Sequence, residues 1–546
     1  MGTVGPAQPA RHARSGRYYL DRMSRTSDLG AGKVPANAPE AAPRIRSLVS
    51  QSLTYGLGSV ASRAVGFFLV PVYLHAAGAV AFGIVELVTS ALIVVAIILR
   101  MGIVSSMTRF TLGDPERGDW SPVVHTIFAF VMAASTLGVL VGVLFHSQLA
   151  SLLGTSDGVV YTGLLGLWVT MNFDVMARIY RIERRAGAWV RYTLLNVAVT
   201  AVLTVLLVTV FDQGAVGLLF GNFGGTLLVY AIMLVQRRRT IGIRHFDSQV
   251  LRELLHFSIP LMPAGLALWA LNLADRVQVK GLAGAHDLGV YSAAAKVALG
   301  VMVVVGAFQT AWPPFAHSIR GEATAKDTFR LVFSYWAMLM GWIVVALTLL
   351  SAPYIALSFP EATHGAIPVV PLLMAGSVMY GGYLVINTGV TFSKKTRMTP
   401  VIAAAAAGIN IGLNFWAIPA YGIVGAGVTT VIGYAALLYM GWANAQRSYP
   451  VNYDWNRVLR VSAVAAAYVA ISIWLVPDSG AVPIAVRVLL IGSFPLALFA
   501  VGALSRGDRA RVAGLLQQRS AARRRPHEPD EVAVDDQRLA DEEPTP

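Results

Sequence analysis

The chain of 546 residues contains no cysteine. Disulfides, thiol nucleophiles and thiolate metal sites are therefore excluded. Charge is also scarce, because Asp, Glu, Lys and Arg together make up only 13% of the residues. Apolar residues make up 55%, and the mean hydropathy is +0.61. A soluble globular protein carries about 25% charged residues, so the composition predicts a protein that crosses a membrane many times.

Sequence patterns of nucleotide, metal and nucleophile sites are absent as well. The chain has no GxxxxGK[ST] and no HExxH, and its ten histidines are scattered. We therefore expect no cofactor, no bound metal and no catalytic residue, and a process driven by an ion gradient or by downhill flow rather than by bound ATP. The net charge of +14 indicates arginines that orient helices at the cytoplasmic face, not a nucleic-acid partner.

Apolar segments long enough to cross a bilayer, about 20 residues each, follow one another along the chain. We place fourteen, at approximately 47–74, 80–106, 122–149, 158–180, 188–211, 214–235, 252–280, 287–312, 328–354, 366–392, 398–418, 421–445, 458–476 and 481–504. Loops after even-numbered segments carry Lys or Arg, and loops after odd-numbered segments carry none. This alternation predicts a multi-pass protein of the plasma (inner) membrane with both termini in the cytoplasm.

An internal repeat relates the two halves of the chain. The sequence AGAVAFG, Ala77 to Gly83, recurs 206 residues later as AGAHDLG, Ala283 to Gly289, and each copy follows an odd-numbered segment. Chance similarity in an Ala/Gly-rich chain is the alternative. The match predicts an all-α polytopic membrane protein of about 14 transmembrane helices, with two six-helix lobes related by a parallel repeat and two appended helices.

The expected divisions of the chain follow from these segments. They are a disordered basic cytoplasmic tail (1–46), an N-terminal six-helix lobe (47–235), a basic cytoplasmic linker (236–250), a C-terminal six-helix lobe (251–445), helices thirteen and fourteen (446–504) and a disordered cytoplasmic tail (505–546).

Charged residues inside the segments mark the candidate site. An ionisable group at membrane depth costs at least about 2.5 kcal/mol, so it usually faces a cavity or a partner. At about 1.5 Å per residue, five such residues fall at similar depth in the outer half of the bilayer: Arg63, Glu86, Asp275, Arg276 and Lys296. With Lys280 they sum to four positive and two negative charges. A cavity with this surplus would suit a diphosphate or another polyanion.

Structural roles are the alternative for several of these charges. Asp275 and Arg276 could pair with neighbours, and Lys280 is expected to extend to the outer membrane surface. Arg100 and Arg487 are expected to reach an interface. A local ion pair is expected one helical turn apart on the fourth segment, between Asp174 and Arg178.

Four stretches have the pattern of a known family. They are RMGIVSSMTRF from Arg100, MARIYRIERRAGAWVRYTLLNV from Met176, FSIPLMPAGLALWALNLADRVQV with GVYSAAAKVA in the second half, and KKTRMTPVIAAAAAGINIGLNFWAIPAYGIVGAGVTTVIGY from Lys394. They resemble the polysaccharide-biosynthesis flippases, the O-antigen and capsule repeat-unit translocases, of the multidrug/oligosaccharidyl-lipid/polysaccharide (MOP) exporter superfamily. The resemblance covers roughly residues 47–445.

The resemblance implies a flippase that moves a polyprenyl-diphosphate-linked oligosaccharide from the inner to the outer leaflet by alternating access, for cell-surface polysaccharide biosynthesis. Basic residues in the family's central cavity are thought to hold the diphosphate, and here the nominees are Arg63, Arg276 and Lys296. Glu86 and Asp275 are candidate ion-coupling residues. The implied partners are the lipid-linked oligosaccharide and membrane lipids, with a polysaccharide polymerase and glycosyltransferases as candidates.

Three other functions stay open. A peptidoglycan lipid-precursor flippase would also have fourteen segments and a basic cavity. A multidrug or cation antiporter of the same superfamily would need a buried acidic site, whereas the predicted cavity is net basic. A polyprenyl-dependent membrane glycosyltransferase would need a catalytic acid in a substantial outer loop, and the outer loops here are short.

Overall fold

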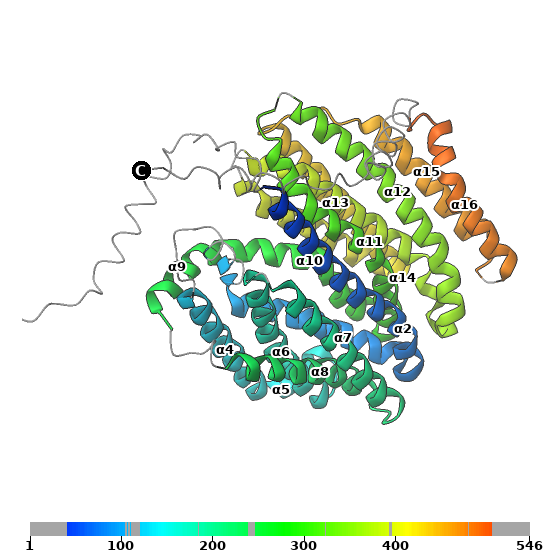
Figure 1. The fold of residues 1–546 in the computed structure, drawn as a ribbon. Coiled ribbons are helices and arrows are strands. Elements are labelled where there is room, and N and C mark those ends of the chain that lie inside the picture. The colour runs from blue at the N-terminus through cyan, green and yellow to red at the C-terminus, as the bar shows by residue number, and fades with distance from the viewer. Residues whose placement is uncertain are drawn as a thin grey trace, which may run out of the picture. The chain divides into compact units, whose positions relative to one another are not determined.

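A computed structural model describes most of the predicted membrane region (Figure 1). The described backbone covers residues 41–103, 106–107, 110, 121–183, 185–238, 246–322, 324–392, 396–478 and 480–504, and the described side chains start at Ala64. The predicted tails 1–46 and 505–546 lie outside the described residues, except for helical backbone from Ala41. The chain divides into Met1–Thr54 and Tyr55–Pro546, and the following concerns the second unit.

The described residues form helices and no strands, as expected for segments whose backbone polar groups must pair internally within lipid. The α-helices are α2 (Ala41–Arg100), α4 (Ser121–Leu144), α5 (His146–Leu153), α6 (Asp157–Ile182), α7 (Ala186–Thr209), α8 (Gly214–Arg237), α9 (Ser248–Ser258), α10 (Met262–Ala283), α11 (Ala285–Ser318), α12 (Ala325–Ser358), α13 (Val369–Phe392), α14 (Thr399–Gln446), α15 (Trp455–Leu475) and α16 (Ala481–Ala500). Short 3-10 helices are η2 (Ile259–Leu261), η3 (Glu361–Ala366) and η4 (Thr396–Met398).

The helix count agrees with the predicted segments. Within the described residues, 11 helices are long and apolar enough to cross a membrane. Two of them, α2 and α14, contain a glycine with non-helical backbone angles, Gly78 and Gly422, and so each corresponds to two predicted segments. Helix α10, which carries Asp275, Arg276 and Lys280, is the remaining one. The all-α polytopic class predicted from the sequence is thereby confirmed.

The two copies of the repeat have the same backbone conformation. Gly78 has φ 79° and ψ 165°, and its equivalent Gly284 has φ 100° and ψ 174°. Only glycine adopts such angles without strain, so each glycine allows the chain to reverse between two long helices. We call the end of the membrane region that holds these two turns the hairpin end, and the opposite end, where α9 lies, the linker end.

The repeats also touch each other symmetrically at the hairpin end. A Cβ atom added to Gly83 would lie 3.0 Å from the carbonyl oxygen of Ala285, and one added to Gly289 would lie 1.9 Å from that of Ala79. Gly83 and Gly289 are 206 residues apart, and so are Ala79 and Ala285, so the two contacts are equivalent under the repeat. The repeats therefore meet across an approximate two-fold axis between Gly83 and Gly289, as the parallel-repeat prediction requires.

The helices pack in two groups (Figure 1). In the first group, which we call the N-lobe, α4, α6, α7 and α8 pack against one another around a core that includes Ile127, Met171 and Tyr230. In the second group, which we call the C-lobe, α10, α11, α13 and α14 form the most extensive contacts, and α12 packs against α11 and α13. Helices α15 and α16 pack against α12, as expected of an appended pair.

Arg487 of α16 was expected to reach an interface, and its side chain extends to the turn between α15 and α16, but it is covered by the protein and is 0% exposed. Its guanidinium donates to the carbonyl oxygen of Leu349 at 3.1 Å and to that of Val476 at 3.0 Å, and pairs with Asp478 at 2.9 Å. A buried arginine is tolerated only when such partners replace water. Arg487 therefore fastens α16 to α12 and to the end of α15.

Replacement of Arg487 by methionine is expected to lower the free energy of unfolding by about 3 kcal/mol, because two buried carbonyl groups lose their donor at about 1–3 kcal/mol each. Asp478, whose side chain is 44% exposed, can turn to water. Arg460→Met serves as the control, since Arg460 is exposed and makes a longer 3.4 Å bond to Val501. Thermal unfolding in detergent measures both, and equal midpoints for the two variants would contradict this role of Arg487.

Candidate functional site

The site lies where α2, beyond its kink, and α10 run side by side in opposite directions. Trp269 of α10 donates from its indole nitrogen to the carbonyl oxygen of Ser90 at 3.0 Å. Toward the linker end, a Cβ atom on Gly102 would lie 2.7 Å from the carbonyl oxygen of Ser258. This close approach of the two lobes places side chains of α2 against those of α10 and α11.

Four of the five predicted site residues come together at this contact between the lobes. The ammonium of Lys296 on α11 lies 2.8 Å from one carboxylate oxygen of Glu86 on α2, and Nε of Arg276 lies 4.0 Å from the other. Arg276 also pairs with Asp275 at 3.4 Å. The side chain of the fifth, Arg63, lies outside the described residues. The depth estimated along each helix therefore identified residues of three different helices that lie in contact.

Neighbouring polar groups hold this cluster in place. Tyr291 donates its hydroxyl hydrogen to Asp275, and the backbone N–H of Arg276 donates to the same carboxylate at 2.9 Å. Nη1 of Arg276 donates to the carbonyl oxygen of Asn272 at 3.2 Å, while the amide oxygen of Asn272 accepts from Tyr434 at 2.5 Å. Asn272 and Tyr434 were missed at the sequence level, although Asn272 stands one helical turn before Arg276.

The cluster is electrically balanced, with two carboxylates facing two cations. Asp275 is only 3% exposed, and the side chain of Lys296, at 35% exposed, is the part of the cluster most open to its surroundings. Charges removed from water in this way need opposite charges beside them. The predicted surplus of two positive charges is therefore not found within this described cluster. An anion that bound to Arg276 or Lys296 would have to replace a carboxylate.

Lys280 lies apart from the cluster. Its ammonium is buried without a hydrogen-bond partner among the described residues, and a Cβ atom on Gly154 would lie 3.1 Å from it. Lys280 thus lies at the hairpin end, but its ammonium is covered by the protein instead of extending freely to the outer membrane surface, as had been expected. Its side chain instead crosses to the turn between α5 and α6, and adds a second contact between the lobes at the hairpin end.

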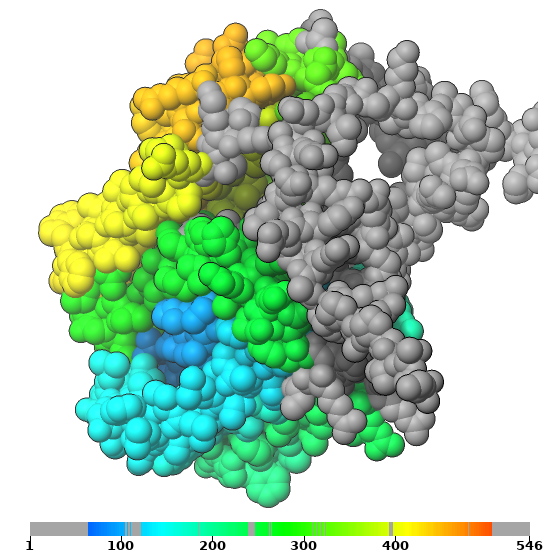
Figure 2. All heavy atoms as spheres, turned by 90° about the vertical axis from the view of Figure 1, so that its left-hand side faces the viewer, coloured from blue at the N-terminus to red at the C-terminus, as the bar shows by residue number. Residues whose placement is uncertain are grey.

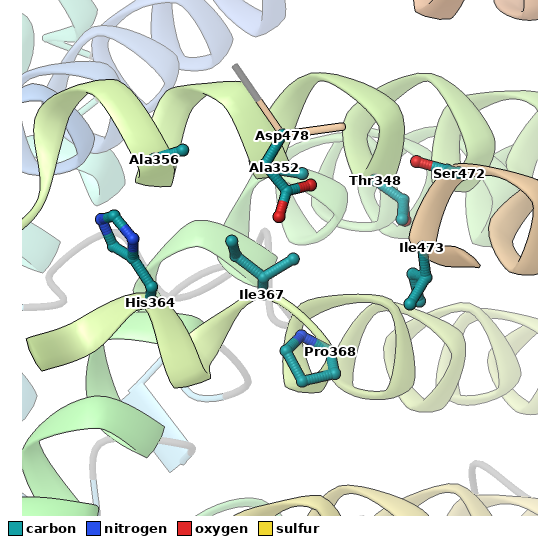
Figure 3. A pocket seen from close by; sticks show the side chains of 9 residues that line it. All are labelled: Thr348, Ala352, Ala356, His364, Ile367, Pro368, Ser472, Ile473 and Asp478. Carbon is teal, nitrogen blue, oxygen red and sulfur yellow. The ribbon is translucent and has the colours of Figure 1, made fainter. Parts of the chain in front are cut away.

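A separate cavity of about 410 Å³ lies between α12, η3 and α15, beside the Arg487–Asp478 pair (Figure 3). Its lining residues are Thr348, Ala352, Ala356, His364, Ile367, Pro368, Ser472, Ile473 and Asp478. None of the predicted site residues lines it. Nor does any group of three or more His, Asp or Glu side chains in the described part of the chain have the arrangement of a metal site.

The interaction between Glu86 and Lys296 can be measured with a double-mutant cycle. Glu86→Gln leaves Lys296 and Arg276 facing each other without their shared carboxylate, so we expect it to destabilise the protein more than the double change Glu86→Gln with Lys296→Gln does. The expected coupling energy is about 1 kcal/mol, within the range found for contacting residues. Thermal unfolding of the four proteins measures it. Strictly additive effects would show that the 2.8 Å contact contributes nothing.

Comparison with known proteins places this architecture in a family. Residues 79–368, more than half of the chain, match the family described as polysaccharide biosynthesis protein. The structure of the lipid II flippase MurJ in an inward closed conformation is similar, with a TM-score of 0.64 and 13% identity over 83% of this chain and 100% of that chain. No curated protein matches the sequence.

A multidrug resistance transporter of the MATE family, itself in the MOP superfamily, has a similar fold. Its inward-facing conformation gives a TM-score of 0.59 at 16% identity, over 73% of this chain and 96% of that one. The corresponding outward-facing structure gives 0.50 at 16% identity, over 76% and 96%. At such low identity the solved structures indicate a common fold rather than a common substrate. The family match establishes that the chain belongs to the polysaccharide biosynthesis protein family, and the chain shares its fold with the lipid II flippase MurJ and with a MATE-family transporter.

Proposed function

We propose that the protein moves a polyprenyl-diphosphate-linked oligosaccharide from the inner to the outer leaflet of the plasma membrane, for cell-surface polysaccharide biosynthesis. The observation that carries the proposal is the cluster of Glu86, Asp275, Arg276 and Lys296 between two lobes of a MOP-type fold. A guanidinium can hold a diphosphate through two parallel hydrogen bonds. Arg276 and Lys296, together with Arg63, are the proposed binding residues.

The proposed cycle depends on the contact between the lobes, where α2 meets α10 and α11. The charges of the loops orient the hairpin end toward the outside and both termini toward the cytoplasm. In the proposed inward-open step the hairpin end stays closed, as it is at Gly83 and Gly289, and the lobes separate at the linker end to admit the substrate from the cytoplasm. The diphosphate then replaces the carboxylates at Arg276 and Lys296, which loosens the pairs that join α2 to α10 and α11. Separation of the lobes at the hairpin end releases the substrate to the outer leaflet.

A peptidoglycan-precursor flippase is the second candidate, favoured by the similarity of fold to the lipid II flippase. A multidrug antiporter fits less well, because both acids of the cluster already pair with cations. Fluorescence-quench flipping in proteoliposomes separates these functions. We expect flipping of a lipid-linked oligosaccharide to exceed that of a lipid-linked peptidoglycan precursor, and no export of a cationic dye. Preference for the peptidoglycan precursor would favour the second candidate.

Glu86 and Asp275 are proposed to couple transport to an ion gradient. Each carboxylate stands beside a cation, so its protonation or ion binding would change how firmly α2, α10 and α11 are joined. We expect Glu86→Gln and Asp275→Asn to alter the dependence of the flipping rate on an imposed gradient more than they alter substrate binding. Flipping rates measured at several imposed gradients test this, and an unchanged gradient dependence in both variants would leave the two acids as structural partners.

A further inference from the structure

A second group of charges lies on α6, away from the cluster described above. Four residues share one face of this helix at spacings of three or four: Thr170, Asp174, Arg178 and Arg181. The opposite face is buried in the N-lobe core through Val175, Met176 and Ile179. The side chain of Asp174 is 50% exposed although it lies two turns inside a membrane-spanning helix. An exposed carboxylate at that depth faces a water-filled space rather than lipid.

Asp174 does not form the expected local pair with Arg178. Its carboxylate instead lies 3.0 Å from Nη1 of Arg100, at the end of α2, and Nη2 of Arg100 donates to the carbonyl oxygen of Thr170 at 3.2 Å. Nε of Arg100 and Nε of Arg178 are both buried without a hydrogen-bond partner among the described residues. Arg178 lies within electrostatic range of Arg100, Asp174 and Arg181.

The charges of this group do not balance. Arg100 pairs with Asp174, whereas Arg178 lies in the same span with no ion pair among the described residues. Arg181, exposed at the end of α6, adds a further positive charge at the linker end. The Glu86 cluster, by contrast, has two acids and two bases. A surplus of this kind is costly at membrane depth unless an anion compensates for it. A diphosphate that joins two organic groups carries two negative charges, and its oxygens suit arginine side chains.

The group lies toward the linker end, the end from which the substrate enters in the proposed cycle. Arg100 follows Glu86 by 14 residues on α2, about 21 Å along the helix toward the linker end. The face of the molecule that bears α9 is turned toward the viewer in Figure 2, and blue atoms of α2 are visible in a hollow between the helices of the two lobes. The arginines therefore stand nearer to the linker end than Arg276 and Lys296 do.

We propose that Arg100, Arg178 and Arg181 form a first binding site for the diphosphate of the substrate, at the linker end of the N-lobe. The diphosphate displaces Asp174 from Arg100 there, and is later transferred to Arg276 and Lys296. Asp174 acts as an internal competitor that occupies Arg100 when no substrate is bound. This inference rests on the proposed function, because the diphosphate is that of the lipid-linked oligosaccharide.

Binding of farnesyl diphosphate, a short polyprenyl diphosphate, tests the site without requiring transport. The protein is placed in nanodiscs of zwitterionic lipid and the dissociation constant is measured. Arg178→Gln is expected to weaken binding about tenfold to a hundredfold, the range for loss of one charge-assisted contact. Asp174→Asn is expected to tighten binding several-fold, since it removes the competitor. Arg330→Gln, an exposed arginine on α12, is the matched control and should change nothing.

The binding test does not require both variants to fold. Arg178 has no ion pair to lose among the described residues, so Arg178→Gln supplies the test even if Asp174→Asn is unstable. Unchanged binding in Arg178→Gln, or weaker binding in Asp174→Asn, would overturn the proposal and leave Asp174 as a structural partner of Arg100. Two competitors identify the ligand: inorganic pyrophosphate should displace the probe and phosphatidylglycerol should not, whereas displacement by phosphatidylglycerol alone would assign the site to a lipid headgroup.

Failure of this site and failure of the proposed function give different results. If the wild-type protein flips the lipid-linked oligosaccharide but Arg178→Gln binds farnesyl diphosphate normally, the function stands and the site is wrong. If farnesyl diphosphate binds as expected but no lipid-linked oligosaccharide is flipped, the site stands as a diphosphate site and the proposed function is wrong.

Discussion

Replacement of Gly289 by alanine is expected to stop most of the flipping activity while leaving the helices folded. The added Cβ atom would lie 1.9 Å from the carbonyl oxygen of Ala79 and 2.5 Å from its carbonyl carbon, and both atoms belong to the backbone. No side-chain rotation can relieve this contact, so α2 and α11 must move apart. Overpacking of this kind costs about 1–3 kcal/mol, which would disfavour closure of the hairpin end by about 5- to 150-fold.

The flipping rate in proteoliposomes and the labelling of a single cysteine measure this effect together. In a Lys280→Cys background, Gly289→Ala should increase labelling by an impermeant maleimide, because separation of the lobes would uncover this position, whose ammonium lies buried beside Gly154 in the closed structure. Gly281→Ala is the matched control, since nothing lies within 4 Å of a Cβ atom added there. Normal flipping and unchanged labelling in Gly289→Ala would show that this contact takes no part in the cycle.

Arg276 is the second residue at which a large effect is expected. Arg276→Ala should lower the flipping rate by about tenfold to a hundredfold, the equivalent of one lost charge-assisted contact of about 1.5–3 kcal/mol. Arg276→Lys should retain part of the activity, because an ammonium keeps the positive charge but cannot form the two parallel hydrogen bonds of a guanidinium. Flipping rates at matched protein levels in proteoliposomes measure both variants.

The buried position of Arg276 requires a test that separates binding from structure. Arg276 neutralises Asp275 at 3.4 Å and approaches Glu86 at 4.0 Å, so its removal alone also leaves Asp275 without an ion pair, while Glu86 keeps Lys296 at 2.8 Å. The double change Asp275→Asn with Arg276→Gln restores the balance of charge. We expect this double variant to fold but to flip slowly. Wild-type flipping by the double variant would rule out a role in diphosphate binding, and Arg252→Ala, an exposed arginine on α9, controls for loss of a positive charge.

The sequence was sufficient to predict the helices because the lipid environment imposes their length and their internal hydrogen bonds. The repeated AGAxxxG turn correctly indicated that Gly78 and Gly284 are equivalent, since both need the same unusual backbone angles. Counting residues from these turns then gave the depth of Glu86 and Lys296. These features depend on distance along a helix, which sequence position determines directly.

The partners of each charge were harder to predict, because they depend on how neighbouring helices are rotated and spaced. Asp174 pairs with Arg100 from another helix rather than with Arg178 one turn away. The ammonium of Lys280 is covered by the turn at Gly154 instead of being exposed at the membrane surface. In both cases the contact joins residues more than 70 positions apart. Local spacing therefore predicted which residues share a depth, whereas packing between helices decided which of them meet.

Separation of the lobes at the hairpin end is the step on which the proposed transport depends. Because the protein has no cysteine, a cysteine pair at Thr155 and Lys280, on either side of the contact between Lys280 and Gly154, can be joined by a short reducible bis-thiosulfonate. Flipping of a polyprenyl-diphosphate-linked oligosaccharide is then measured in proteoliposomes before and after reduction. We expect the linked protein to be inactive and the reduced protein to recover its rate. Equal flipping in the linked and reduced states would contradict transport by separation of the two lobes.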